Sequence, residues 1–494
     1  MKKILSLALA LALVCTCLAS FAMADVDPST LDPYEIEWYT LGDTANSEEV
    51  VMAAINEYLT EKFNATLVMH KNSNSDHLQK LQMMVAGGEP YDLAFISNQY
   101  GNYVAQEAFY PLTDLLNEYG QDILAIYPQA LWDCVTIGGE KYAIVTHKYS
   151  CDYFYYGISK TQSDAVGVST DWVKDESLDR DGRWAAFLNW IKEMKAAGGD
   201  TNGYVTGMGT GPFGSLYPID SMTGSASDPG AVIIGDDSFS NQEPNVVFNQ
   251  FATPEFEEYC KQVRELFNLG CLPIDPSTSV TWANGDPAVS TQDSMAKRLP
   301  GYCITYAQEF LEYRPNYSFT NTQKLYGSMN AIGADSGDPA RVMMLLNELI
   351  ANTEFANMIF YGREGVSYER NEEGQIKKNT EEWNMTTWSL PGFCTAEPDT
   401  TLPINMNEMY AAFDKELVYS NNIGFVFDEN PILTELSGIR QVTKEYLDPL
   451  TKGLADPETE LPKFLDALNA AGVDAVLAEE QAQLDAWRAR EGKD

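Results

Sequence analysis

The first part of the chain alternates between two hydrophobic periods, and this alternation limits the folds that are open to it. Residues 36–40 alternate as a strand does, 65–70 is a second strand candidate, and 91–97 is a dense apolar strand. Between these segments, apolar residues recur at helical spacing in 46–63 and in 78–85. The order strand, helix, strand, helix, strand predicts an α/β domain with a largely parallel sheet.

The length and the net charge of the chain limit its number of domains and its possible binding partners. Its 494 residues exceed what one hydrophobic core organises, so two or three domains are expected. The chain carries 32 Lys+Arg against 72 Asp+Glu, a formal net charge of −40. Nucleic acids and anionic membranes repel such a protein, because binding either of them requires clustered basic side chains. The charge therefore excludes nucleic-acid binding, and it is most simply explained by solubility in a crowded or salty exterior.

The first 24 residues have the features of a secretory signal peptide. Residues 1–3 are cationic, 4–13 are almost wholly apolar, and Ala22-Met23-Ala24 provides small residues for cleavage after Ala24. Cys15 and Cys17 raise the question of a lipid anchor, which needs a cysteine after a small residue. Neither cysteine fits that rule well, so release into the exterior is favoured over anchoring at the cell surface.

Removal of the signal peptide takes away two of the 8 cysteines. An even number outside the cell permits disulfides, and Cys260 with Cys271, or Cys134 with Cys151, would close short loops. Buried thiols are the favoured interpretation. The absence of CxxC spacing and the presence of only 3 His argue against a zinc or haem site. The cysteines that remain are Cys134, Cys151, Cys260, Cys271, Cys303 and Cys394.

Motifs for cofactors or catalysis are weak. GTGPFG (209–214) matches a dinucleotide-binding fingerprint as text, but no helix start follows it. Asp179-Arg180-Asp181-Gly182 resembles the middle of a calcium loop, yet Ser177 and Leu188 occupy the positions where a full loop has acids, so a solvated turn is favoured over an ion. The sequence has no GxSxG elbow and little histidine for nucleophilic catalysis. We expect no cofactor, no metal and no enzymatic activity.

The remainder of the chain is helical in much of its pattern. Residues 302–306 are predicted to form a returning strand, and the tail from Pro431 onward is strongly helical. A packing brace is favoured over a partner-binding helix for this tail. Helical spacing occurs before it in 184–197, 256–269, 339–350 and 355–361.

A series of segments, in their order along the chain, carries a resemblance to one protein family. They are IEWYTLGD (36–43), MMVAGGEPYDLAFISN (83–98), AFYPLTDLL (108–116), GGEKYAIV (138–145) and NLGCLPIDP (268–276). With them the chain resembles the extracellular solute-binding proteins of ABC importers, in the sugar-type family 1. Residues 337–369 and 430–487 resemble a lipoprotein-like branch of this family that carries a C-terminal domain of unknown function.

The resemblance implies a two-lobed, periplasmic-binding-protein-like fold of type II with a helical C-terminal extension. It implies that a small molecule binds between the lobes, that a hinge motion closes them, and that an ABC permease in the membrane receives the ligand. We expect a monomer. The expected domains are a signal peptide at 1–24, a first lobe at 32–145 plus about 299–325, a second lobe at 146–298 plus about 326–428, and a helical C-terminal domain at 429–494.

Candidate ligand contacts follow from the carboxyl ends of the predicted strands, where ligands of open α/β sheets bind. Sugars need aromatic faces against their C–H groups, and carboxylates or amides against their hydroxyls. The first lobe offers such a mixture at its strand ends, although Trp38 fits a core position equally well, and Asp43 and Asn98 fit turns. These first-lobe candidates are Trp38, Tyr39, Asp43, Asn98 and Tyr100.

The second lobe is expected to contribute aromatic side chains. Tyr155 belongs to a run of aromatic residues that a buried strand explains as well, whereas Trp282 lies in an apparent loop with Asn284 and Asp286. Trp388 is a weaker candidate of the same kind. The predicted function is capture of an oligosaccharide or sugar derivative for an ABC importer. A peptide-binding protein of the same fold, an exported glycoside hydrolase and a sensor for a membrane kinase are the alternatives.

Overall fold

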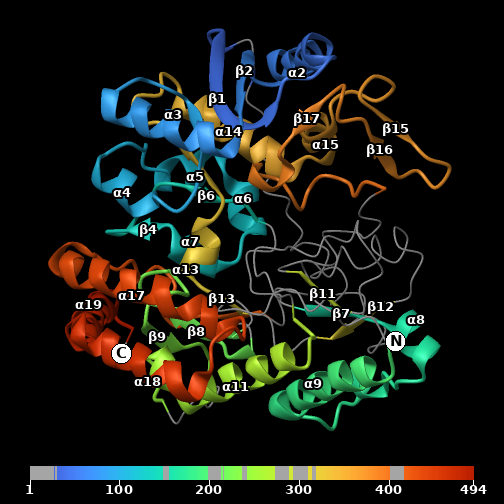
Figure 1. Ribbon diagram of the computed structural model, residues 1–494. Helices are drawn as coiled ribbons and strands as arrows, with labels where there is room; N and C mark the ends of the chain where they lie inside the picture. The colour runs from blue at the N-terminus through green and yellow to red at the C-terminus, as the bar shows by residue number, and fades with distance from the viewer. Residues whose placement is uncertain are drawn as a thin grey trace, which may run out of the picture. The chain divides into compact units, whose positions relative to one another are not determined.

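The computed structural model describes residues 27, 30–147, 155–198, 213–214, 216–235, 242–272, 289–292, 310–313, 319–400 and 417–493 (Figure 1). Side chains are not described at 155–157, 289–292, 310 and 312–313. The predicted signal peptide, the predicted strand at 302–306, Trp282, Cys151 and Cys303 lie outside the described residues.

The chain divides into two compact units. The first consists of Met1–Thr146, Ser328–Glu369 and Lys378–Ala396, and the second of His147–Gly327, Arg370–Lys377 and Glu397–Asp494.

Two of the expected domain boundaries are corrected by this division. The segment expected to return to the first lobe, 299–325, contains β12 (Phe310–Tyr313), which instead pairs with β7 (Tyr155–Ser159) of the second unit. The strand that does return is β14 (Met329–Ile332), because it forms hydrogen bonds with two strands of the first unit. The first unit therefore includes much of the chain that was expected in the second lobe.

The first unit is built on one mixed sheet with the order β17-β1-β3-β14-β6, and β2 pairs with the other edge of β1. The strands are β1 (Tyr34–Asp43), β2 (Ala65–Asn72), β3 (Leu93–Ile96), β6 (Ile144–Val145), β14 and β17 (Asn384–Met385). β1 is parallel to β2 and to β3, which confirms the parallel pairing predicted from the sequence. β14 runs antiparallel to β3 and β6, and β17 runs antiparallel to β1.

The helices of the first unit follow the predicted apolar spacing. α2 (Glu48–Phe63) buries Val51, Ile55, Leu59 and Phe63, which recur every fourth residue and form its inner face. α3 (Asn74–Gly87) ends at Gly88, whose positive φ of 65° suits a helix C-cap. The other helices are α4 (Tyr100–Ala105), α5 (Thr113–Tyr119), α6 (Gln121–Ile126), α7 (Gln129–Cys134), α14 (Pro339–Ala351), α15 (Thr353–Tyr361) and the 3-10 helix η5 (Thr387–Ser389).

The remaining short strands form small two-stranded sheets. β4 (Thr136–Ile137) pairs with β5 (Glu140–Lys141), and β15 (Tyr368–Arg370) pairs with β16 (Ile376–Lys378). In the second unit, β13 (Phe319–Thr320) pairs in parallel with β18 (Val418–Tyr419).

Within its described residues, the second unit has two three-stranded sheets and several helices. One sheet has the order β11-β7-β12, and the other has the order β10-β9-β8. Its elements include β8 (Ile219–Ser221), β9 (Gly230–Ile233), β10 (Phe248–Asn249), β11 (Val289–Gln292), α8 (Lys160–Val166), η2 (Asp171–Lys174), α9 (Arg180–Ala196), η3 (Gln250–Ala252), α11 (Pro254–Asn268) and α13 (Thr322–Tyr326).

The C-terminal helices belong to the core of the second unit. They are η6 (Asn430–Ile432), α17 (Leu433–Thr451), α18 (Pro457–Ala470) and α19 (Val473–Glu491), and Figure 1 shows them beside β8 and β9. Leu436, Phe464 and Leu484 join one buried cluster with Phe187 of α9 and Phe256 of α11. The C-terminal helices therefore act as a packing brace, because their apolar stripes join the buried core of the second unit.

The calcium-like motif is the start of a helix. Asp179 is the N-cap of α9, and its Oδ1 accepts a hydrogen bond from the amide of Gly182 at 2.8 Å. We expect Asp179→Ala to lower the free energy of unfolding by about 1 kcal/mol, because an amide of the first turn loses its acceptor. Urea denaturation checks the value, and a loss of stability that appears only with calcium present would instead support an ion site.

Of the two interpretations of the cysteines, the favoured one holds at Cys260, which is a free and fully buried thiol and forms no disulfide with Cys271. Burial, with a smaller contribution from Glu257, raises the pKa of this thiol to about 12, so Cys260 is an unreactive core residue.

Candidate functional site

The carboxyl-terminal edge of β1 and β3 gathers polar side chains in the first unit. Tyr39 and Ala94 are paired residues of these parallel strands, and Asp43 and Asn98 each follow that pair by four positions. Asp43 and Asn98 therefore lie at the same edge of the sheet. Asn98 is exposed and has a positive φ of 61°, so it also forms the turn after β3.

β17 adds an amide to this edge. Its residues pair with the end of β1, so that Asn384 lies opposite Asp43. Asn384 Nδ2 donates a hydrogen bond to Asp43 Oδ2 at 3.1 Å, and both groups are exposed. The carboxylate and the amide thus form a ready pair for hydrogen bonds to hydroxyl groups.

Trp388 is held on a rigid base at the same edge. Its ring contacts that of Phe95 edge to face, with centroids 5.6 Å apart and planes at 83°, and 39% of the residue remains exposed. Ser328 Oγ donates to the carbonyl of Trp388 at 2.9 Å, and Asn330 Nδ2 donates to the carbonyl of Ser389 at 2.9 Å. An aromatic ring that is exposed and yet fixed in position loses little entropy when a ligand stacks on it.

Phe95 is in turn supported from α3. His77 Nε2 lies 2.7 Å from the carbonyl oxygen of Phe95, and the two rings contact each other at 5.6 Å. Burial lowers the pKa of His77, so the neutral imidazole donates this hydrogen bond. The supporting residues His77, Ser328 and Asn330 could not be found from the sequence, because no local motif marks a side chain that acts through another segment.

Trp388 was expected on the second lobe, and the structure corrects this. The residue follows β17, which pairs with β1, so Trp388 belongs to the first unit. Thr386 donates its amide hydrogen to the carbonyl of Leu41 at 3.2 Å, which fixes the segment before Trp388 to the end of β1.

Trp38 and Tyr39 lie on opposite faces of the sheet, because side chains alternate along a strand. Trp38 is fully buried, as the core alternative predicted. Tyr39 stacks on His70 with ring centroids 4.2 Å apart, and Lys80 Nζ lies 4.8 Å from its ring centre. A ligand contact by either residue remains a prediction.

The structure gives Tyr100 a structural role. Tyr100 is fully buried at the start of α4, where its hydroxyl donates to the carbonyl of Val135 and accepts from the amide of Tyr142. Desolvation raises its pKa above the ordinary value for tyrosine. Its proposed contact with ligand would require these two hydrogen bonds to be exchanged.

The remaining candidates from the second unit are less defined. Tyr155 is the first residue of β7 and pairs with Gln292 of β11, which agrees with the strand alternative. Trp282 lies outside the described residues, so its contact with ligand also remains a prediction.

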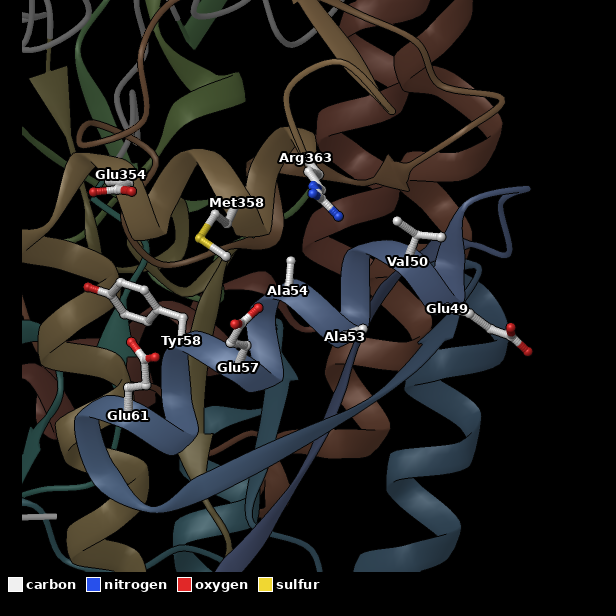
Figure 2. Close-up of a pocket in the computed structure, with 10 residues that line it drawn as sticks. All are labelled: Glu49, Val50, Ala53, Ala54, Glu57, Tyr58, Glu61, Glu354, Met358 and Arg363. Atoms are coloured by element: carbon white, nitrogen blue, oxygen red, sulfur yellow. The ribbon is translucent and has the colours of Figure 1, made fainter. Parts of the chain in front are cut away.

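A separate open groove of about 630 Å³ lies between α2 and α15 (Figure 2). α2 lines it with Glu49, Glu57 and Glu61, and Ala53 and Ala54 lie between these acids. An exposed helix of a chain with a net charge of −40 carries such acids without a ligand. The other lining residues are Val50, Tyr58, Glu354, Met358 and Arg363.

Metal-binding clusters and membrane-spanning helices are both absent from the described residues. Among the described residues, no group of three or more His, Cys, Asp or Glu side chains is arranged to hold a metal ion. In the same part of the chain, every helix is too short or too polar to cross a bilayer.

Comparison with known proteins adds a family context. Residues 421–489 match the model described as Domain of unknown function (DUF3502). A carbohydrate ABC transporter substrate-binding protein from Streptococcus pneumoniae serotype 4 is 23% identical over 471 residues, which are 91% of this chain and 90% of that protein.

Solved structures share the fold over almost the whole length. The N-glycan transport solute binding protein NgtS from Streptococcus pneumoniae has a TM-score of 0.76 at 20% identity, covering 92% of this chain and 98% of that chain. The same protein in complex with Man1GlcNAc has a TM-score of 0.65 at 19% identity, covering 92% and 99%.

These relatives are transport binding proteins rather than enzymes. The predicted fold class is confirmed by the solved structures, and the predicted C-terminal domain by the family match. This chain is thus similar in sequence to a carbohydrate ABC transporter substrate-binding protein, shares the two-lobed fold of the solved solute-binding proteins, and carries the domain DUF3502 at residues 421–489.

Proposed function

We propose that this protein is the substrate-binding component of an ABC importer, which captures an oligosaccharide or sugar derivative and delivers it to a membrane permease. The observation that carries the proposal is Trp388, which is 39% exposed on a base formed by Phe95, Ser328 and Asn330. The names of the relatives support it, since they are carbohydrate and N-glycan transport proteins.

The chemistry of this edge suits an uncharged sugar. The indole face of Trp388 packs against the C–H face of a pyranose ring, which excludes water from both surfaces. Asp43 accepts hydrogen bonds from sugar hydroxyls, while Asn384 and Asn98 provide amides that donate and accept. The Asp43 carboxylate repels a uronic acid, so we expect neutral oligosaccharides to bind in preference to acidic ones.

The decisive experiment is a thermal-shift and calorimetric screen of residues 25–494 against neutral and acidic oligosaccharides and short peptides. A ligand that binds only the folded protein stabilises it by about 2.7 kcal/mol at a hundredfold excess over the dissociation constant. A rise with one glycan class supports the proposal. A rise with peptides alone would replace the sugar by a peptide, and turnover of glycans by the pure protein would favour a hydrolase.

Trp388→Ala is expected to weaken binding of the identified sugar about tenfold or more, because an aromatic anchor is lost. Trp388→Phe keeps a ring on the same base and should retain part of the affinity. Met83→Ala removes another exposed apolar side chain, 60% exposed on α3, and should leave affinity unchanged. Unaltered affinity in Trp388→Ala, with a native melting temperature, would remove this site assignment.

We also propose export through cleavage after Ala24, with release rather than lipid attachment at Cys15 or Cys17. Mass spectrometry of the exported protein separates these outcomes, because cleavage leaves Asp25 as the first residue and lipidation leaves a modified cysteine. The monomeric state and the hinge closure remain predictions.

A further inference from the structure

Glu480 of α19 is a buried carboxyl group that has no hydrogen-bond partner within the described part of the chain. Its exposed fraction is 0%, and among the described residues neither Oε1 nor Oε2 has a partner. Native proteins rarely leave a buried polar group unpaired, so such an exception calls for an explanation.

The carboxyl group fits into a slot that a glycine creates. Gly230 is the first residue of β9, and a Cβ atom built on it would lie 1.6 Å from Glu480 Oε2. Glu480 therefore lies directly against the backbone of β9, and any side chain at position 230 would displace it. Because of this close approach, the packing of α19 on β9 depends on whether the Glu480 carboxyl group is protonated or ionised.

The surroundings favour the protonated form of that group. Asp228, two positions before Gly230, is 1% exposed and forms an ion pair with Arg440 of α17 at 2.8 Å. Arg440 also pairs with Glu429 at 2.6 Å, so its guanidinium serves two other carboxylates. Desolvation first, and the charge of Asp228 second, raise the pKa of Glu480 to about 8.

Burial and Asp228 are the causes of the raised pKa of Glu480, and no described cation is among them. Asp228 precedes β9, Arg440 comes from α17, and Glu429 precedes η6. On α18, the residues buried in the described structure are Pro457, Leu461, Phe464 and Leu468, and none of them is charged.

We propose that Glu480 is a proton-dependent latch in the C-terminal domain: its protonated carboxyl group keeps α19 seated on β9, and ionisation loosens this helix from the second unit. Glu480 lies within residues 421–489, which match the domain of unknown function, so the proposal assigns a pH-dependent packing to that domain. It does not depend on which ligand the protein binds.

The direction of the effect follows from proton linkage. Seated α19 holds a proton up to a pH of about 8, whereas an exposed glutamate loses it near pH 4.3. Between these values the opened state binds fewer protons, so opening becomes about tenfold easier for each unit of rising pH. Below the lower value the latch is fully closed, and above the upper value no further loosening occurs.

Hydrogen–deuterium exchange of residues 25–494 between pH 5 and 9 tests the latch. The readout is the ratio of α19 amide protection in Glu480→Gln to that in the wild type, which cancels the intrinsic pH dependence of exchange. We expect this ratio to rise about tenfold per pH unit up to about pH 8 and then to level off. Glu479→Gln changes the neighbouring carboxylate, which is partly exposed and accepts from Gln483 at 2.9 Å, and should give a constant ratio.

A ratio for Glu480→Gln that is constant from pH 5 to 9 would overturn the proposal. So would a pH-dependent change shared equally by α2 of the first unit, because that result indicates global unfolding rather than release of α19. Glu480→Met fills the same slot with an uncharged side chain of similar length, so it replaces the glutamine variant if that protein does not fold. The expected and opposing results are the same for both variants.

Discussion

Arg341→Met is expected to lower the free energy of unfolding by about 3–5 kcal/mol. Arg341 is 4% exposed in the first turn of α14. Its guanidinium donates to the carbonyls of Asp32, Phe63 and Asn64 at 3.2, 2.7 and 3.1 Å, and it forms an ion pair with Asp338 at 3.2 Å. Methionine keeps the apolar part of the arginine side chain. The decrease in the free energy of unfolding therefore measures the cost of leaving three carbonyls and one carboxylate without a donor.

Urea denaturation followed by circular dichroism measures this loss. Arg490→Met is the matched control, because Arg490 is 68% exposed and its pair with Glu491 contributes about 1 kcal/mol at most. Arg341→Lys should fall between the two, since an ammonium group reaches fewer carbonyls than a planar guanidinium. A value for Arg341→Met within about 0.5 kcal/mol of the control would show that water replaces the lost donors.

Gly392→Ala is expected to cost about 2–5 kcal/mol and to weaken ligand binding as well. Gly392 has a φ of +77°, and a Cβ atom there would lie 2.4 Å from the carbonyl oxygen of Leu349 in α14. The backbone must therefore move, and the segment that moves includes Trp388, four positions earlier. Both the unfolding free energy and the dissociation constant for the identified sugar should change.

Gly88→Ala separates backbone strain from collision. Gly88 also has a positive φ, +65°, but nothing lies within 4 Å of a Cβ atom built on it. We expect a cost of about 1 kcal/mol for this variant and no change in affinity, because only the conformational preference is affected. Equal losses in the two variants would mean that the contact with Leu349 relaxes without consequence.

Helices with a strong apolar period could be predicted from the sequence, because burial of one face is a local property. α2 buries the four residues that its spacing indicates, and the tail from Pro431 folds into α17, α18 and α19.

β14 could not be predicted in this way. All four of its residues are buried, so it shows no alternation, and its partners are distant in the sequence.

The candidate site shows the same limit. The polar residues after β1 and β3 could be placed at one edge, since parallel strands share their carboxyl ends. Alternation along β1 separates Trp38 from Tyr39, but it does not reveal which face of the sheet is covered. The base beneath Trp388 depends on Ser328 and Asn330, which reach it only through the tertiary pairing of β14.

The position of β14 between β3 and β6 also determines when the first unit can fold on the ribosome. Both neighbouring strands have been synthesised by residue 145, but the strand that joins them begins only at residue 329. Until then, two strand edges have unpaired amides and carbonyls, and such edges invite association with other chains. Translation must therefore pass through His147–Gly327 of the second unit before the sheet of the first can close, so the two strand edges stay unpaired throughout that interval.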